Sequence, residues 1–201
     1  MKMQYGSKNL FLGLLMTAGI ICAPAAQAAL EDLGNGVIAD TDLGIQWLAD
    51  GNYSKTSGYN TNGLMTWNAA NKWVDQLNAG GHDDWRLPTT NEFSHLFSGE
   101  LDGVKDQNIY DTHNNANFAL FSNIQTPYYG LHAYWTATPT GNIDTHSTFA
   151  FNYGRDFSDN NDSANFAMAV RTVVPEPETY AMLLAGLGLV SLVARKRKQG
   201  S

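Results

Sequence analysis

The pattern of apolar and polar positions predicts a β-hairpin ahead of the first helix. Residues 36–40 (GVIAD) and 44–48 (GIQWL) are short apolar stretches, and TDLG joins them. Two short apolar runs separated by turn-forming residues are typical of antiparallel strands. A polar stretch rich in Gly, Asn, Ser and Tyr follows, and we interpret it as a loop.

Apolar residues recur at helical spacing from Thr66 onward, which predicts the first helix. Thr66 suits the N-cap position, and Gly80-Gly81 marks the end of the helical pattern. The residues on the apolar face are Trp67, Ala70, Trp73, Val74 and Leu77.

A second helix is predicted directly after the sequence WRLP at 85–88. Thr89 and Glu92 have the spacing of a capping box, and Phe93, Leu96 and Phe97 supply an apolar face. Residues 99–126 are polar and rich in Asn and Asp, without a clear period. We expect a long surface loop there, of the kind in which ligand contacts often lie.

Three later stretches have the pattern of strands: 134–138 (YWTAT), 148–152 (TFAFN) and 166–173 (FAMAVRTV). In the last two, side chains of different character alternate, as in a strand with one buried face. The whole pattern predicts an α+β domain in which short antiparallel strands bracket two early helices, without βαβ repeats.

The first 28 residues have the features of a secretory signal peptide. Lys2 and Lys8 precede an apolar run at 10–22, and Ala26-Gln27-Ala28 fits a small-x-small cleavage site. We expect a signal peptidase to cut after Ala28. The alternative is an uncleaved anchor, but the run is shorter than the roughly 20 residues that a membrane-spanning helix needs.

The C-terminal segment, 174–201, combines three features in order. Two prolines flank Glu176, an uncharged apolar stretch covers 180–194, and four basic residues follow. A helix of that length would cover about 22 Å of a roughly 30 Å hydrocarbon layer, so it could insert with the basic side chains in the cytoplasmic headgroups. The residues of this expected sorting signal are Pro175, Glu176, Pro177, Arg195, Lys196, Arg197 and Lys198.

Residues 29–173 remain as one domain, and their composition excludes several functions. They hold six of the twelve Lys and Arg and seventeen of the nineteen Asp and Glu, a net charge of −11. Such a surface repels phosphate backbones, so we expect no nucleic-acid partner. The one cysteine, Cys22, lies in the signal peptide, so the domain has no disulfide, cysteine metal ligand or cysteine nucleophile.

The candidate ligand-binding residues are aromatic or cationic. Trp85 offers a large face, and Arg86 a planar donor fork suited to a carboxylate. The alternative for both is a structural corner, with Trp85 packed in the core and Arg86 paired to Glu92. Tyr128 and Tyr129 follow Pro127 in a predicted loop, and exposed rings of this kind stack on sugars.

The sequence RDFSDNNDSAN at 155–165 is the candidate calcium site. It places oxygen ligands at short spacing in what we predict to be one loop, and Ca²⁺ takes six to eight oxygens. The alternative is an Asn- and Asp-rich turn. The candidate ligands are Asp156, Asp159, Asn160 and Asp162. The five histidines have no zinc-binding spacing.

The C-terminal segment resembles the PEP-CTERM sorting signal over residues 174–198. Proteins with this signal are exported by Gram-negative bacteria and are typically associated with exopolysaccharide or biofilm matrix. The resemblance implies that an exosortase processes the tail, and that the C-terminal helix holds the protein in the membrane only until then. A plain C-terminal membrane anchor is the alternative.

The central domain resembles the Lcl C-terminal domain family, also called domain of unknown function 1566. The matching sequences are DLGIQWL, TWNAANKWVDQLNAGGHDDWRLPTTNEFSHLF, YWTAT and AMAVRTV, in this order from about residue 37 to 173. The resemblance implies a fold similar to C-type lectin and formylglycine-generating-enzyme domains. It also implies an exported or surface-associated protein with a role in adhesion, such as binding a sulfated polysaccharide.

We therefore expect a non-catalytic protein of the periplasmic or outer surface, or of the extracellular matrix. Its lectin-like domain would bind polysaccharide or another matrix component, with Ca²⁺ as a possible cofactor. One alternative is a structural matrix component without a specific ligand. The other is a polysaccharide-cleaving enzyme with a pair of carboxylates, although the chain has no GxSxG, P-loop or dinucleotide motif.

Overall fold

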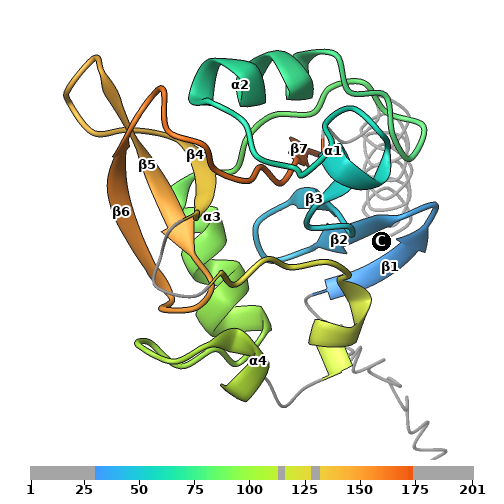
Figure 1. Ribbon diagram of the computed structural model, residues 1–201. Helices are drawn as coiled ribbons and strands as arrows, with labels where there is room; N and C mark the ends of the chain where they lie inside the picture. The colour runs from blue at the N-terminus through green and yellow to red at the C-terminus, as the bar shows by residue number, and fades with distance from the viewer. Residues whose placement is uncertain (1–29, 113–115, 128–131, 174–201) are drawn as a thin grey trace, which may run out of the picture.

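The computed structural model describes residues 30–112, 116–127 and 132–173 (Figure 1). The expected signal peptide, the C-terminal sorting segment, Tyr128 and Tyr129 lie outside the described residues. The predictions made for them therefore remain predictions.

One antiparallel sheet has four strands in the order β1-β2-β3-β7. Its strands are β1 (Leu30–Gly34), β2 (Val37–Asp40), β3 (Ile45–Leu48) and β7 (Val170–Thr172). The predicted hairpin is confirmed as β2–β3, with Val37 opposite Leu48 and Asp40 opposite Ile45. The sequence pattern missed β1 because only its first residue is buried, so it has no apolar period.

The second antiparallel sheet has three strands in the order β4-β5-β6. These are β4 (Tyr134–Pro139), β5 (Thr145–Ala150) and β6 (Arg155–Asn160). The strand prediction for β4 is confirmed. The strand predicted over 148–152 is confirmed in part, since β5 begins at Thr145 and ends at Ala150, and the single loop predicted over 155–165 is wrong. β6 is an exposed edge strand paired along its length with β5, and an edge strand of this kind carries no apolar signal.

The strand predicted over 166–173 is mostly wrong. Only β7 at its end pairs in the sheet, and residues 165–170 are all buried. This segment runs between the two sheets, with an isolated bridge from Tyr134 to Phe166 on one side and from Arg86 to Val170 on the other. A segment surrounded by protein on all sides needs no alternation of apolar and polar side chains.

Both predicted helices are confirmed, although the first ends at Asp75 and not at Gly80-Gly81. α2 (Trp67–Asp75) begins at Thr66, whose side chain accepts a hydrogen bond from the Ala69 N–H. α3 (Thr90–His95) begins with the complete Thr89–Glu92 capping box and continues as a π-helical turn, η1 (Leu96–Glu100). The short helices α1 (Tyr53–Thr56), α4 (Ile109–Thr112) and η2 (Ala116–Leu120) were not predicted, and the last two interrupt the expected long loop.

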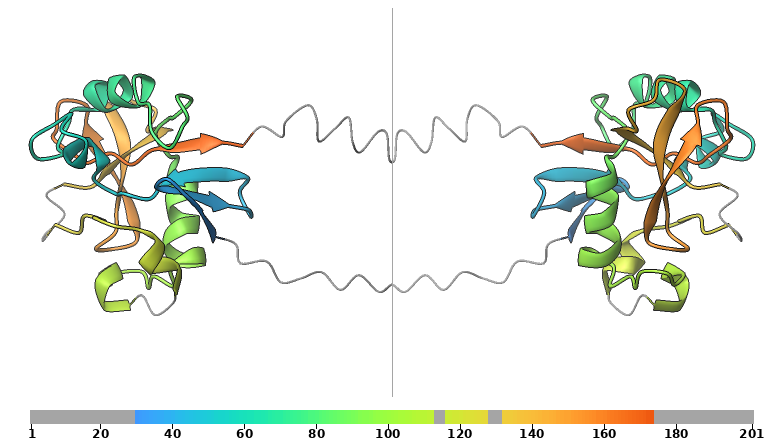
Figure 2. Two further views of the ribbon diagram at one scale, coloured as in Figure 1. Left: turned by 90° about the vertical axis from the view of Figure 1, so that its right-hand side faces the viewer. Right: turned by 90° about the vertical axis from the view of Figure 1, so that its left-hand side faces the viewer.

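The α3–η1 helix lies between the two sheets in both Figure 1 and Figure 2. Its Phe93 is fully buried and contacts aromatic rings of both sheets, Trp47 on one side and Tyr134 and Phe149 on the other. A second buried cluster lies under α2 and includes Trp73, Trp85 and Trp135. The two clusters hold the connecting loops in fixed positions, and these loops carry the polar sites.

Candidate functional site

The tryptophan of the DWRLPT sequence is part of the core. Trp85 is 4% exposed, and its indole N–H donates to the carbonyl oxygens of Ala79 and His82 at 3.2 and 3.0 Å. Neither face of this ring is open to a ligand. The geometry agrees with the structural alternative for Trp85, in which the ring packs against the residues under α2.

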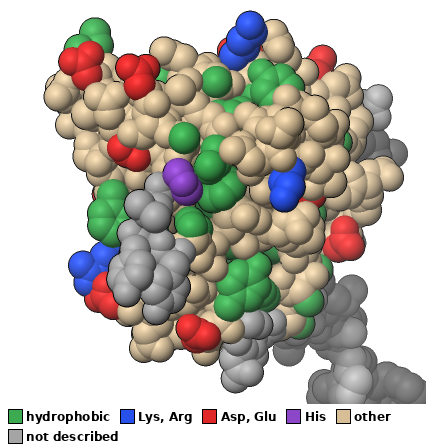
Figure 3. Space-filling model, in the orientation of Figure 1, with side chains coloured by type: hydrophobic (Ala, Val, Ile, Leu, Met, Phe, Trp, Pro, Cys, Tyr) green, Lys and Arg blue, Asp and Glu red, His purple; other side chains and the backbone are tan. Residues whose placement is uncertain are grey.

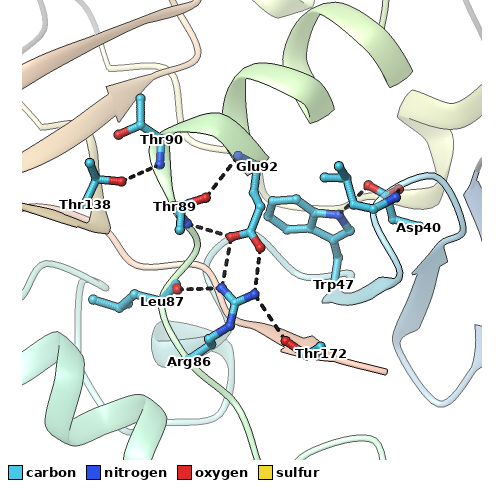
Figure 4. A network of polar contacts seen from close by, with 10 residues as sticks. Asp40, Trp47, Arg86, Leu87, Thr89, Thr90, Glu92, Thr138 and Thr172 are labelled. Atoms are coloured by element: carbon cyan, nitrogen blue, oxygen red, sulfur yellow. Dashed lines mark hydrogen bonds and ion pairs between the residues drawn. The ribbon is translucent and has the colours of Figure 1, made fainter. Parts of the chain in front are cut away.

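Arg86 joins three segments of the chain (Figure 4). Its guanidinium forms a two-pronged ion pair with Glu92, with N–O distances of 2.9 and 2.6 Å, and also reaches the Leu87 carbonyl and the Thr172 hydroxyl. Its backbone exchanges two hydrogen bonds with Val170. Through the partners of its two terminal nitrogens and its backbone, Arg86 connects the start of α3 to β7.

Glu92 is held in its charged form by this arrangement. Burial raises the pKa of its carboxyl, but hydrogen bonds from Arg86 and from the Thr89 N–H outweigh burial and hold the pKa below its usual value. A similar pair lies nearby: Arg171 hydrogen-bonds Asp84 and thereby lowers the pKa of that carboxyl. Both pairs attach β7 to neighbouring segments.

The candidate calcium ligands divide between β6 and the turn that follows it. Asp156 and Asp159 are three residues apart on a strand, so their side chains lie on opposite faces. Asp159 accepts hydrogen bonds from the Ser163 hydroxyl and the Asn165 amide at 2.6 and 2.8 Å. Asn160 accepts one from the Asp162 N–H. The structure thus gives three of these residues a role in closing the turn, and calcium binding stays a prediction.

An open groove lies between α1 and the C-terminal end of α2. Its volume is about 410 Å³, and two tyrosine rings and two amide side chains border it. Tyr59 is 47% exposed, and Gln76 and Asn78 are exposed as well. All lining residues are uncharged: Tyr53, Ser57, Gly58, Tyr59, Trp73, Gln76, Leu77 and Asn78.

The sequence pattern did not single out this groove. Tyr59 lies in the polar loop after β3, where no periodicity indicates which way a side chain faces. Gln76 and Asn78 follow the last turn of α2, and only the packing of α2 beside α1 brings them near Tyr59. The only feature of the sequence that indicates a binding surface there is the presence of Tyr and Gly in the loop.

Among the described residues, one group of side chains is arranged so that it could hold a metal ion: Asp42, His95 and Glu100. The ligand atoms of the three lie within 4.8 Å of one another. The group is remote in sequence from the predicted calcium residues and shares no residue with the groove.

The structure is an α+β domain of two small antiparallel sheets and short helices. The sequence model of the Lcl C-terminal domain matches residues 36–173. The chain belongs to the Lcl C-terminal domain family. The PEP-CTERM protein-sorting motif matches residues 173–198. No curated protein sequence matches the chain.

The sorting motif implies an exported protein of the cell surface or matrix, with an exosortase as its processing partner. Neither matched family is a known catalytic domain. Within the described residues, no helix has the length and apolar character needed to cross a bilayer, and the expected C-terminal helix lies outside them.

Proposed function

We propose that residues 29–173 form a non-catalytic module that binds a polysaccharide of the cell surface or biofilm matrix. The groove lined by Tyr53 and Tyr59 is the observation that supports this function most directly. Exosortase processing of the tail would leave the module at the surface or in the matrix, where its ligand is abundant.

The groove has the chemistry that sugars need. A sugar ring has an apolar face, which stacks on an aromatic ring, and a rim of hydroxyls, which both donate and accept hydrogen bonds. The exposed ring of Tyr59 supplies the first, and the amides of Gln76 and Asn78 supply both donors and acceptors for the second. Concave sites with aromatic walls and a few polar groups are typical of ligand binding.

Charge favours a neutral polysaccharide. The groove has no charged lining residue, and the domain carries a net charge of −11. On the face shown in Figure 3, acidic side chains are spread widely and basic ones are few. Such a surface would repel a sulfated or phosphorylated chain, except where a cation lies between them.

A glycan array tests this proposal, using the full chain in Ca²⁺ and again in EDTA. We expect binding to neutral glycans that Tyr59→Ala weakens about 5- to 150-fold, since stacking of this kind contributes about 1–3 kcal/mol in comparable base–aromatic contacts. The control is Phe157→Ala, which removes an equally exposed ring, 47%, on β6 and away from the groove. Loss of binding in EDTA would indicate a calcium site and would favour Asp159 and Asp162 as its ligands. No binding in either condition would favour a structural matrix component.

A further inference from the structure

The turn between β2 and β3 is held in place by a buried carboxylate. Asp40 is 1% exposed, and it accepts hydrogen bonds from the Leu43 N–H at 3.0 Å and the Trp47 indole N–H at 3.2 Å (Figure 4). Two hydrogen bonds from different parts of the hairpin fix the turn. The turn carries Asp42, which is exposed, beside the end of α3.

The π-helical turn brings His95 and Glu100 together. An α-helix advances about 100° per residue, so residues five apart would lie about 140° from one another around its axis. In η1 the Leu101 N–H instead bonds the Leu96 carbonyl, five residues back, and this wider turn places His95 Nε2 3.2 Å from Glu100 Oε1. Such turns are rare and frequently mark functional sites.

The group concentrates negative charge around one imidazole. Glu100 is 5% exposed, and His95 Nε2 also lies 3.9 Å from Asp40 Oδ1. Burial raises the pKa of the Glu100 carboxyl, Asp40 and Asp42 raise it further, and His95 opposes them. His95 Nε2 is buried and, despite its short distance to Glu100, makes no aligned hydrogen bond.

We propose that Asp42, His95 and Glu100 bind a divalent transition-metal ion, for which Zn²⁺ is the probe. One imidazole nitrogen and two carboxylates are a ligand set that suits this ion. Ligand atoms bonded to zinc at about 2.0–2.2 Å lie about 3–4 Å apart, so the three atoms, within 4.8 Å of one another, need only small side-chain rotations.

Each residue has a distinct role in this site. Asp42 closes it from the solvent side, His95 supplies the nitrogen ligand, and Glu100 supplies a buried charge that the ion neutralises. Asp40 is a positioning residue, because both of its oxygens already accept hydrogen bonds within the hairpin. The ion would tie the β2–β3 turn to the end of α3 and η1, two segments more than fifty residues apart along the chain.

The test is a zinc titration of the full chain, exported from a bacterial host, purified in mild detergent and freed of metal with a chelator. A chromophoric zinc indicator in competition reports affinity and stoichiometry, and Co²⁺ in place of Zn²⁺ reports coordination through its visible absorption. We expect a single site per chain and a rise in Tm with added Zn²⁺. Asp42→Asn and His95→Gln should both abolish stoichiometric binding and the rise in Tm.

Matched controls are Asp83→Asn and His82→Gln, which remove the same groups outside the site and should bind Zn²⁺ like the wild type. Asp42 is exposed, so its variant should fold, and circular dichroism checks this before titration. The proposal is overturned if the wild type takes up no Zn²⁺ in stoichiometric amount, as expected for a simple ion pair between protonated His95 and Glu100. It is equally overturned if both site variants keep wild-type affinity.

Discussion

Two polar clusters each contain a glutamate whose pKa is shifted, in opposite directions. One is the Arg86 corner, formed by Arg86, Glu92 and Thr89, and the other is the His95 group, formed by Asp42, His95 and Glu100. At the corner, Glu92 receives two hydrogen bonds from one guanidinium and a third from the Thr89 N–H, and its pKa is lowered. In the His95 group, Glu100 is more deeply buried, accepts a hydrogen bond from the Asn117 amide at 3.3 Å and lies near two further carboxylates, and its pKa is raised.

The difference distinguishes a structural polar network from a candidate ligand site. A buried charge with complete, aligned partners stabilises the fold around it. A buried charge whose neighbours include like charges and a poorly aligned imidazole costs stability, and a bound cation would offset that cost. The structural account of Arg86 and the proposed metal site follow from the same criterion.

Arg86→Ala should have the largest effect on stability. The substitution leaves the Glu92 carboxylate without its cation and detaches α3 from β7. We therefore expect the free energy of unfolding to fall by about 2–3 kcal/mol. This is less than the full cost of breaking a buried pair, because Arg86 is partly exposed. Urea unfolding measures it. The control Arg155→Ala breaks an exposed pair with Asp106 and should change stability by less than about 1 kcal/mol. An equal loss of stability in both variants would show that the Arg86–Glu92 pair contributes no more than an exposed ion pair.

The same substitution at the two glutamates should have opposite signs in metal-free protein. Glu92→Gln loses charge-assisted hydrogen bonds and should lower the free energy of unfolding by about 1–2 kcal/mol. Glu100→Gln removes an unfavourable buried charge and should be neutral or stabilising by up to about 1 kcal/mol. Urea unfolding in a chelating buffer compares them, and destabilisation of the same size in both would contradict the comparison.

Acidification should separate the two carboxyls further. The folded pKa of Glu92 lies below its usual value of 4.5, so its contribution is present above pH 4.5 and is lost as the pH falls below it. The folded pKa of Glu100 lies above 4.5, so its unfavourable contribution disappears as the pH falls through that raised pKa towards 4.5.

Urea midpoints between pH 7 and pH 4 test this through differences between proteins, in which the other carboxyls cancel. Relative to Glu100→Gln, the wild type should gain stability as the pH falls towards 4.5. Relative to Glu92→Gln, it should lose stability below pH 4.5. Parallel curves for all three proteins would mean that neither carboxyl is coupled to folding as described.

The elements that can be predicted from the sequence are those whose causes lie within a few residues. Thr66 and the Thr89–Glu92 box mark the starts of α2 and α3, and the turn between β2 and β3 defines the hairpin. The domain family and the sorting motif can also be identified from the sequence, because each is a pattern of residue types along the chain. Arg86 pairing with Glu92 also followed from sequence, as one of two interpretations.

Features that depend on residues far apart along the chain arise only when the domain folds. β6 is a strand because β5 pairs with it, although its own residues are typical of a loop. The groove exists because α1 packs beside the end of α2. Asp42 lies near His95 because the core around Phe93 fixes α3 against the first sheet, and a π-helical turn then adds Glu100. Local propensity and capping act over one helical turn, whereas these sites arise from packing of side chains far apart in the sequence.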